Sequence, residues 1–237
     1  MSAEVRQLTL PLSEQEARGL RLGEMVSLNG LLFTGRSLFH IRAAERGIVP
    51  PVDFKLVNAF FHVGPVMRRV EAPGAAGHWE VVSCEPTSSL RFERYGPFVV
   101  RQLGLRTLIG KTTMGPATAA ALAEVGGVHL TKVGLCGNAL ARAVVKVHGV
   151  YFMEELGKTE ATWVYEVSDF GPFFVDIDAS GANYFQQLSA EIAGRSEAIA
   201  RQLGIPAGYE FTDVSGRIVR VGGAEMVSGE RGPGQGE

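Results

Sequence analysis

The chain has 237 residues, enough for one large domain or two small ones. Its composition, 46% hydrophobic residues with 30 glycines, suits a loop-rich α/β domain with a sizeable core. The formal net charge of −2 gives no reason to expect nucleic acid or an anionic membrane as a partner, so any recognition of an anion has to be local.

Hydropathy and the N-terminal residues bear on the cellular location of the protein. No apolar run approaches the roughly 18 residues that a membrane-spanning helix needs. The start, MSAEVRQLTL, lacks the charged segment followed by an apolar stretch that is typical of a signal peptide. We therefore expect a cytoplasmic protein.

The part of the chain up to Gly47 is predicted to contain a strand, a hairpin and a helix. Hydrophobic and polar residues alternate over residues 4–11, as in a half-buried strand. Asn29-Gly30 stands between two apolar runs and predicts a hairpin over residues 25–34. A helix follows over residues 37–46 and ends at Gly47.

The central part alternates predicted strands with predicted helices. In chain order these are strands at 57–62 and 79–83, a helix at 89–103, a strand at 106–109, a helix at 117–125, a strand at 128–133, a short helix within 134–143 and a strand at 144–153. This alternation is typical of βαβ units and an α/β fold with a mixed, partly parallel sheet. Such sheets bind ligands beyond the carboxyl ends of their strands, here at residues 84–91 and 110–116.

The remaining segments are assigned from composition and pattern. They are a mobile surface loop at 73–77, strands at 162–167 and 173–178 around Gly171-Pro172, an amphipathic helix at 183–203 and a hairpin at 209–221. We expect a main domain of residues 1–190, a helix and hairpin extension of residues 191–227, and a disordered tail of residues 228–237.

Hydroxyl groups and cations gather in the turns after predicted strands. A helix N-terminus offers free backbone N–H groups, which suit a carboxylate, and hydroxyls add further donors. A guanidinium matches a carboxylate with two parallel hydrogen bonds. Such groups around one point would make a pocket for a doubly negative ligand. The candidates are Thr87, Ser88, Ser89, Arg36, Arg91 and Lys111.

Each of these residues also has a purely structural interpretation. Hydroxyls at residues 87–89 fit helix N-caps. Arg36 and Arg91, taken singly, fit solvated surface arginines. His40 lies on a predicted helix facing apolar residues and fits a buried histidine as well as a ligand-binding one. Cys136 fits a small core residue.

A phosphate-binding loop is a weaker alternative at the same turn. Gly104 and Gly110-Lys111-Thr112 approximate the GxxxxGK[ST] pattern of nucleotide-binding proteins. Five residues, 105–109, separate the glycines, and they include the core of a predicted strand. Phosphate cradling needs a glycine-permissive loop there, so the match is incomplete.

Several motifs in order resemble the β subunit, or C-terminal domain, of the class I fumarase and L-tartrate dehydratase family. The family's A-R-D-x-x-H segment is similar to residues 35–40 (GRSLFH), and its G-P-T-T-S-x-R-M-D signature to residues 85–93 (EPTSSLRFE). Its I-G-K-G loop is similar to residues 109–112 (IGKT), and its F-P-V-x-V-x-D-x-x-G strand to residues 170–181 (FGPFFVDIDASG). The resemblance covers roughly residues 8–190.

The resemblance implies a swivelling β/β/α domain and a hydro-lyase that reversibly hydrates or dehydrates a small dicarboxylic acid. In the family, a separate α subunit holds a [4Fe–4S] cluster whose iron acts as a Lewis acid. We therefore expect a hetero-oligomer and no metal on this chain. The two cysteines, Cys84 and Cys136, are far apart and fit that division, because a cluster needs several thiolates.

The resemblance also implies roles for individual residues. Thr87 corresponds to the family's proton-abstracting hydroxyl, with Ser88 as a substrate contact. Arg91 and Lys111 join them as catalytic residues that neutralise the dianion. Substrate binding would fall to Arg36, Ser89 and His40.

Some positions depart from the family's pattern. Glu85 replaces a Gly, Ser37 an Asp, Ser88 a Thr, Phe92 a Met and Thr112 a Gly. A carboxylate at Glu85, beside a dianion site, would repel the ligand. These departures leave the choice of diacid open, and they also fit a catalytically inactive relative that binds a dicarboxylate or a partner subunit.

Overall fold

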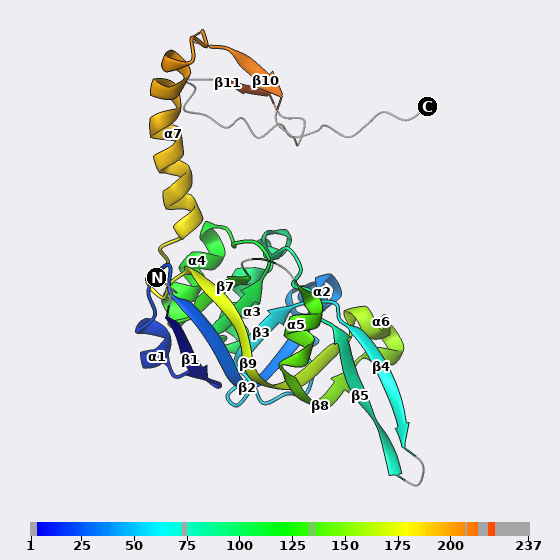
Figure 1. Cartoon of the computed structure of the whole chain (residues 1–237). Helices are drawn as coiled ribbons and strands as arrows, with labels where there is room; N and C mark the ends of the chain where they lie inside the picture. The colour runs from blue at the N-terminus through cyan, green and yellow to red at the C-terminus, as the bar shows by residue number, and fades with distance from the viewer. Residues whose placement is uncertain are drawn as a thin grey trace, which may run out of the picture. The chain divides into compact units, whose positions relative to one another are not determined.

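The computed structural model describes residues 4–72, 75–132, 134, 136–206, 208–212 and 218–220. The chain divides into two compact units, Met1–Tyr184 and Phe185–Glu237. The first unit contains a large mixed sheet with helices packed against it (Figure 1). Within the described residues, no helix is long and apolar enough to cross a membrane.

The first unit is built from nine strands, six α-helices and one 3₁₀ turn among its described residues. The strands are β1 (Val5–Thr9), β2 (Met25–Gly35), β3 (Ala59–His62), β4 (Val66–Ala72), β5 (Ala75–Ser83), β6 (Thr107–Gly110), β7 (Val128–Lys132), β8 (Val144–Tyr151) and β9 (Thr162–Ile177). The helices are α1 (Glu14–Arg18), α2 (Ser37–Arg46), η1 (Ser89–Phe92), α3 (Gly96–Leu103), α4 (Pro116–Val125), α5 (Gly137–Arg142) and α6 (Met153–Glu160). Strand β4 and helix α6 are not among the elements predicted from the sequence.

Seven strands form one sheet in the order β1-β2-β3-β6-β7-β9-β8. Neighbours from β1 to β7 run parallel, and β9 runs antiparallel to β7 and β8. Because β9 also pairs with β2, the strands β2, β3, β6, β7 and β9 close into a ring. The prediction of an α/β fold with a mixed, partly parallel sheet is confirmed.

The hairpin predicted around Asn29-Gly30 is wrong, because β2 runs through both residues as one continuous strand. Gly30 has a φ of 115°, and a Cβ there would lie 2.6 Å from the Leu10 carbonyl oxygen. The register between β2 and β9 shifts between Leu28 and Gly30. The glycine therefore serves a β-bulge and a close backbone approach rather than a turn.

Two further strand predictions need correction. The strands predicted at 162–167 and 173–178 are one 16-residue strand, β9. Its first part pairs with β8 and its last part with β7, while β2 runs alongside both, so Gly171-Pro172 lies inside a paired strand. The loop predicted at 73–77 is partly strand, because β5 begins at Ala75; residues 73–74 lie outside the described residues.

Side chains that alternate along the strands supply two hydrophobic clusters. Leu32, Phe61 and Ile109 belong to one cluster, while their neighbours Phe33 and Phe60 belong to the other. The second cluster lies under α2, α3 and α4, which cover one side of the ring. Burial on both faces explains why these strands are almost entirely apolar.

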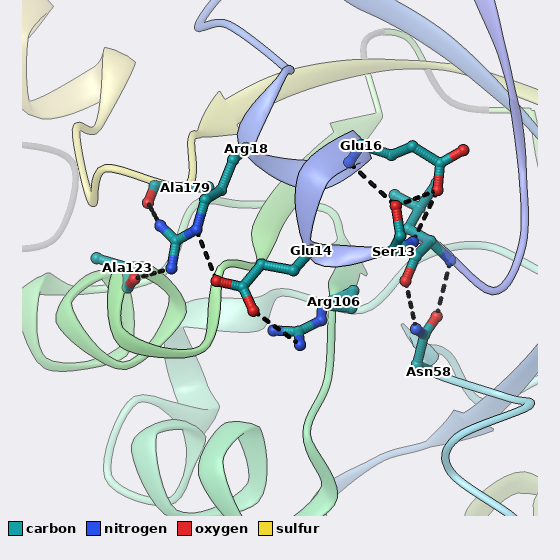
Figure 2. A network of polar contacts seen from close by, with 9 residues as sticks. Ser13, Glu14, Glu16, Arg18, Asn58, Arg106, Ala123 and Ala179 are labelled. Carbon is teal, nitrogen blue, oxygen red and sulfur yellow. Dashed lines mark hydrogen bonds and ion pairs between the residues drawn. The ribbon is translucent and has the colours of Figure 1, made fainter.

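Polar contacts hold the N-terminal segment to the rest of the unit (Figure 2). The Asn58 side chain accepts from the Leu12 N–H at 3.2 Å and donates to the Leu12 carbonyl at 2.8 Å. Arg18 donates to Glu14 at 2.8 Å and to the carbonyl of Ala123 near the end of α4 at 3.4 Å. These contacts fix α1 against the start of β3 and the C-terminal end of α4.

The second unit contains α7 (Tyr184–Gln202) from its second residue onward, and a small two-stranded sheet. That sheet pairs β10 (Glu210–Thr212) antiparallel with β11 (Ile218–Arg220). The turn of the predicted hairpin and the whole predicted tail lie outside the described residues. The domain boundaries at 190 and 227 stay predictions.

Candidate active site

The carboxyl ends of three parallel strands place the predicted site residues along one edge of the sheet. Gly35 at the end of β2 pairs with His62 at the end of β3. Phe61 pairs in turn with Ile109 in β6. Arg36 and Lys111, which directly follow β2 and β6, therefore emerge at the same end of the parallel strands, where open and closed α/β sheets alike bind ligands.

The turn that carries Thr87 docks onto this edge through its backbone. Pro86 forms an isolated β-bridge with Val63, just beyond β3. The Thr87 N–H donates to the His62 carbonyl at 2.7 Å, and the Thr87 carbonyl accepts from the Lys111 N–H at 3.1 Å. Thr87 is thus held between the ends of β3 and β6. Its side chain is half-buried and has no hydrogen-bond partner within the described residues.

Ser88 and Thr112 join the two loops through their side chains. Their hydroxyl oxygens lie 2.9 Å apart, and Thr112 Oγ1 also accepts from the Leu90 N–H at 3.3 Å. The Lys111 carbonyl accepts from the Thr131 hydroxyl at 2.8 Å. The loop that begins with Lys111 is therefore tied on one side to the Ser88 turn and on the other to β7.

Ser89 and His40, expected to contact substrate, lie in the interior. Ser89 is fully buried, and its Oγ lies 2.8 Å from His62 Nδ1 and 3.2 Å from His129 Nε2. His40 is 1% exposed; its Nε2 lies 3.2 Å from His62 Nε2, and its ring stacks on Phe92. Both side chains are therefore buried beneath the turn, and their contact with substrate stays a prediction.

Burial determines the charge of two of these histidines. Desolvation lowers the pKa of His40 to about 3. The pKa of His62 is also lowered well below its ordinary value, first by burial and then by the neighbouring His40 and His129. Both imidazoles are therefore neutral near pH 7.

Three cations border the turn in different environments. The Arg36 guanidinium lies 3.5 Å from Glu160, its buried Nε has no hydrogen-bond partner in the described part of the chain, and its Cδ packs against Gly64. Arg91 and Lys111 are exposed, and across the described ranges neither has an ion-pair partner. Within the described residues, Arg91 and Lys111 are thus free of ion pairs, whereas Arg36 lies beside a glutamate.

Nothing in the described residues fits a metal centre. No group of three or more His, Cys, Asp or Glu side chains there is arranged to hold an ion. Cys84 is buried, and burial followed by the charge of Glu85 raises its thiol pKa to about 12, which disfavours the thiolate that a metal requires. Cys136 is exposed and has no second cysteine beside it.

Comparison with known proteins identifies the family. The profile described as Fumarase C-terminus matches residues 2–188. The chain belongs to the fumarase C-terminal family.

Its relatives are named as two kinds of enzyme. L(+)-tartrate dehydratase subunit beta of Escherichia coli strain K12 is 31% identical over 197 residues, which cover 83% of this chain and 94% of the relative. A putative fumarate hydratase class I of Geobacillus stearothermophilus is 35% identical over 188 residues, 78% of this chain and 35% of the relative. A putative L(+)-tartrate dehydratase subunit beta of Methanocaldococcus jannaschii is 29% identical over 184 residues, 76% of this chain and 91% of the relative. Because the chain belongs to the fumarase C-terminal family, the interpretation of residues 104–112 as a nucleotide-binding loop is rejected.

Glu85, which departs from the family's pattern, packs against a glycine of α5. A Cβ on Gly137 would lie 2.8 Å from its carboxylate, which places Glu85 beside the start of α5. The charge of Glu85 also acts on Lys132, whose pKa is lowered mainly by burial and is raised in part by this carboxylate.

Glu93, at the last position of the signature, has a structural role that sequence reasoning missed. Its carboxylate accepts from the Gly115 N–H at 2.7 Å, the Thr118 N–H at 3.0 Å and the Thr118 hydroxyl at 2.7 Å. It therefore caps the N-terminus of α4 from a distant part of the sequence. In the sequence, the acidic residue at the end of the signature was the only indication of this capping role.

Proposed function

We propose that this chain is the β-type subunit of an iron–sulfur-dependent hydro-lyase that reversibly hydrates or dehydrates a small dicarboxylic acid, such as fumarate, malate or tartrate. The observation that carries the proposal is the position of Thr87, whose backbone bridges the ends of β3 and β6 beside Lys111. Relatives named as tartrate dehydratase subunits and a fumarate hydratase support the reaction class.

In this proposal the cations hold the doubly negative substrate. Arg91 and Lys111 are exposed and free of ion pairs within the described residues, so each can bind a carboxylate without first breaking an ion pair. Arg36 gives up only a 3.5 Å contact with Glu160. Removing a proton beside a carboxylate increases the charge on that carboxylate, which nearby cations stabilise more in the transition state than in the ground state.

The Thr87 hydroxyl is the proposed proton-transfer group. A hydroxyl is a poor base unless adjacent positive charge strongly lowers its pKa, so its role depends on these cations. Its lack of a side-chain partner among the described residues leaves it available to substrate. Ser88 is the proposed neighbouring contact, with its own hydroxyl oriented by Thr112.

The remaining catalytic groups belong to a partner in this proposal. The described residues offer no metal site, so the expected [4Fe–4S] cluster would reside on an α subunit, in a hetero-oligomer. The relative from Escherichia coli is itself named as a subunit beta, which supports such a partner. A cytoplasmic location stays a prediction.

Reconstitution under anaerobic conditions tests the proposal. The full chain is combined with its candidate α subunit and assayed against fumarate, malate, the tartrate stereoisomers and a methylated diacid. Turnover of at least one diacid is expected. Calorimetric binding of a diacid without turnover would instead favour the inactive relative.

Arg91→Ala should lower kcat/KM by at least about 100-fold, the usual cost of losing a charged transition-state contact. The matched control is Arg94→Ala, which removes the exposed arginine three positions along and should stay within about threefold of the unaltered enzyme. Circular dichroism checks that both variants fold. An Arg91→Ala enzyme with unaltered kcat/KM would exclude the proposed role.

A further inference from the structure

A line of five buried side chains runs beneath the turn that carries Thr87. Its members come from β9, β7, η1, β3 and α2, and none is more than 1% exposed: Asp176, His129, Ser89, His62 and His40. Asp176 Oδ1 lies 2.6 Å from His129 Nδ1 and adds a carboxylate to the contacts among Ser89 and the histidines.

The hydrogen-bonding chemistry of these groups orients the line, so that in every pair the donor is the member farther from Asp176. A carboxylate only accepts hydrogen bonds, so His129 Nδ1 carries a hydrogen. In the tautomer whose single ring hydrogen is that one, His129 Nε2 accepts from the Ser89 hydroxyl. That hydroxyl has a single hydrogen, so Ser89 Oγ accepts from His62 Nδ1–H. His62 Nε2 then has no hydrogen and accepts from His40 Nε2–H. Every donor points toward Asp176.

The far end of the line agrees with this direction. Among the described residues, His40 Nδ1 has no hydrogen-bond partner. In the assigned direction this nitrogen has only a lone pair, whereas the reverse direction would leave a buried N–H unpaired, which is costly. Burial also keeps His40 and His62 neutral, with one N–H each, because it lowers both pKa values.

Ser89 and His62 connect the line to both loops of the site. A Cβ on Gly110 would overlap Ser89 Oγ, so the residue before Lys111 packs directly against this hydroxyl. The His62 carbonyl accepts the Thr87 N–H. Any displacement of Ser89 or His62 is therefore passed to Thr87 on one side and to the Lys111 loop on the other.

We propose that His62, His129 and Asp176 are positioning residues of this site, acting through Ser89 as a buried line of hydrogen bonds with one donor direction. The line sets the placement of the Thr87 turn and the Lys111 loop. Its effect on turnover rests on the proposed function, whereas its hydrogen positions do not depend on any activity.

NMR of the full chain with ¹⁵N-labelled histidine tests the direction and needs no variant. The expected tautomers are Nδ1–H for His62 and His129 and Nε2–H for His40. The exposed His78 and His148 serve as references within the same spectrum. A hydrogen on His129 Nε2, in the neutral or the charged ring, or a charged imidazole at His62 at pH 7, would overturn the assignment.

Asp176→Asn removes the fixed direction while keeping the size of the side chain. An amide both donates and accepts, so His129 can take either tautomer without losing its hydrogen bonds. We expect kcat of the reconstituted enzyme to fall by about 10- to 100-fold, because small displacements of reacting groups cost this much. KM should change less than kcat, and the midpoint of thermal unfolding should not fall. The control Asp169→Asn makes the same exchange at an exposed position of β9 and should leave kcat unaltered.

Backbone amide NMR separates failure of this inference from failure of the proposed function. Asp176→Asn should shift the amide signals of Thr87 and Lys111, and Asp169→Asn should not. Unaltered signals together with unaltered kcat in Asp176→Asn would overturn the positioning role and leave the hydro-lyase proposal standing. If the reconstituted enzyme turns over no diacid, the proposed function fails, and the amide signals still decide the positioning role.

Discussion

Two residues that depart from the family's pattern are in contact with each other. Ser88 stands where the pattern has Thr, Thr112 stands where it has Gly, and their hydroxyl oxygens lie 2.9 Å apart. The first change removes a methyl group and the second adds a side chain that also accepts from the Leu90 N–H. The two departures therefore lie in direct contact, and the Thr112 hydroxyl links the Lys111 loop to the turn.

A double-mutant cycle tests this link. Thr112→Val keeps the shape of the side chain but removes the hydroxyl, and Ser88→Ala removes its partner. The two changes should show a coupling free energy of about 1 kcal/mol in urea unfolding, as expected for a paired hydrogen bond. Additive effects would mean that the two hydroxyls do not interact in solution.

At the residue scale, sequence and structure identified different parts of the site. Arg36, Thr87 and Lys111 are predicted from the sequence because they stand in turns after strands and match ordered motifs. His62 and His129 were missed, because a single histidine in an apolar strand has no pattern that predicts a partner. Their pairing depends on the sheet placing β3 and β7 on either side of Ser89, which no local window of sequence contains.

Among the elements, α4 has the clearest dependence on a distant residue. It starts at Pro116 after Gly115, and no side chain from its own start caps it. Glu93 supplies the acceptor from the segment between η1 and α3. The signature therefore carries a stabilising residue directly beside the proposed catalytic ones.

Glu93→Gln should lower the free energy of unfolding by about 1 to 3 kcal/mol, because an amide NH₂ would face N–H donors in a half-buried site. The control Glu124→Gln, toward the other end of α4, breaks an exposed ion pair with Arg101 and should cost less than about 0.5 kcal/mol. Urea unfolding measures both. Equal stability of the two variants would contradict the capping role.

Element predictions succeeded where local pattern decides the structure and failed where a distant strand does. The helix of residues 37–46 and its end at Gly47 follow from local sequence and are present as α2. In β2 and β9, Gly30 and Gly171-Pro172 were interpreted as turns, although both positions lie inside paired strands. Both positions are strand rather than turn because β2 pairs with β9, a pairing between distant segments that local sequence does not indicate.

For the whole molecule, the buried neutral histidines make stability depend on pH. In the unfolded chain a histidine takes up a proton below about pH 6.5. In the folded chain His40 resists protonation until its pKa of about 3, and the pKa of His62 is also lowered. The unfolded state therefore binds more protons in acid, and stability falls as pH drops below about 6.5.

Urea unfolding at pH 7.5, 6.5 and 5.5 measures this dependence. Each buried histidine should contribute a slope of up to about 1.4 kcal/mol per pH unit on the acid side. His40→Phe, placed among Phe39, Phe60 and Phe92, should reduce the slope. A free energy of unfolding that is the same at pH 5.5 and 7.5 would show that the folded protein protonates these histidines as readily as the unfolded one.

The buried line under Thr87 also bears on how this family can change over time. Its five side chains come from five separate elements, and each hydrogen in it is shared by two neighbours. Replacing one member leaves a buried donor or acceptor of its neighbour without a hydrogen-bond partner. These positions should therefore covary among homologues, so that a lineage either inherits the full set or exchanges it together for apolar residues.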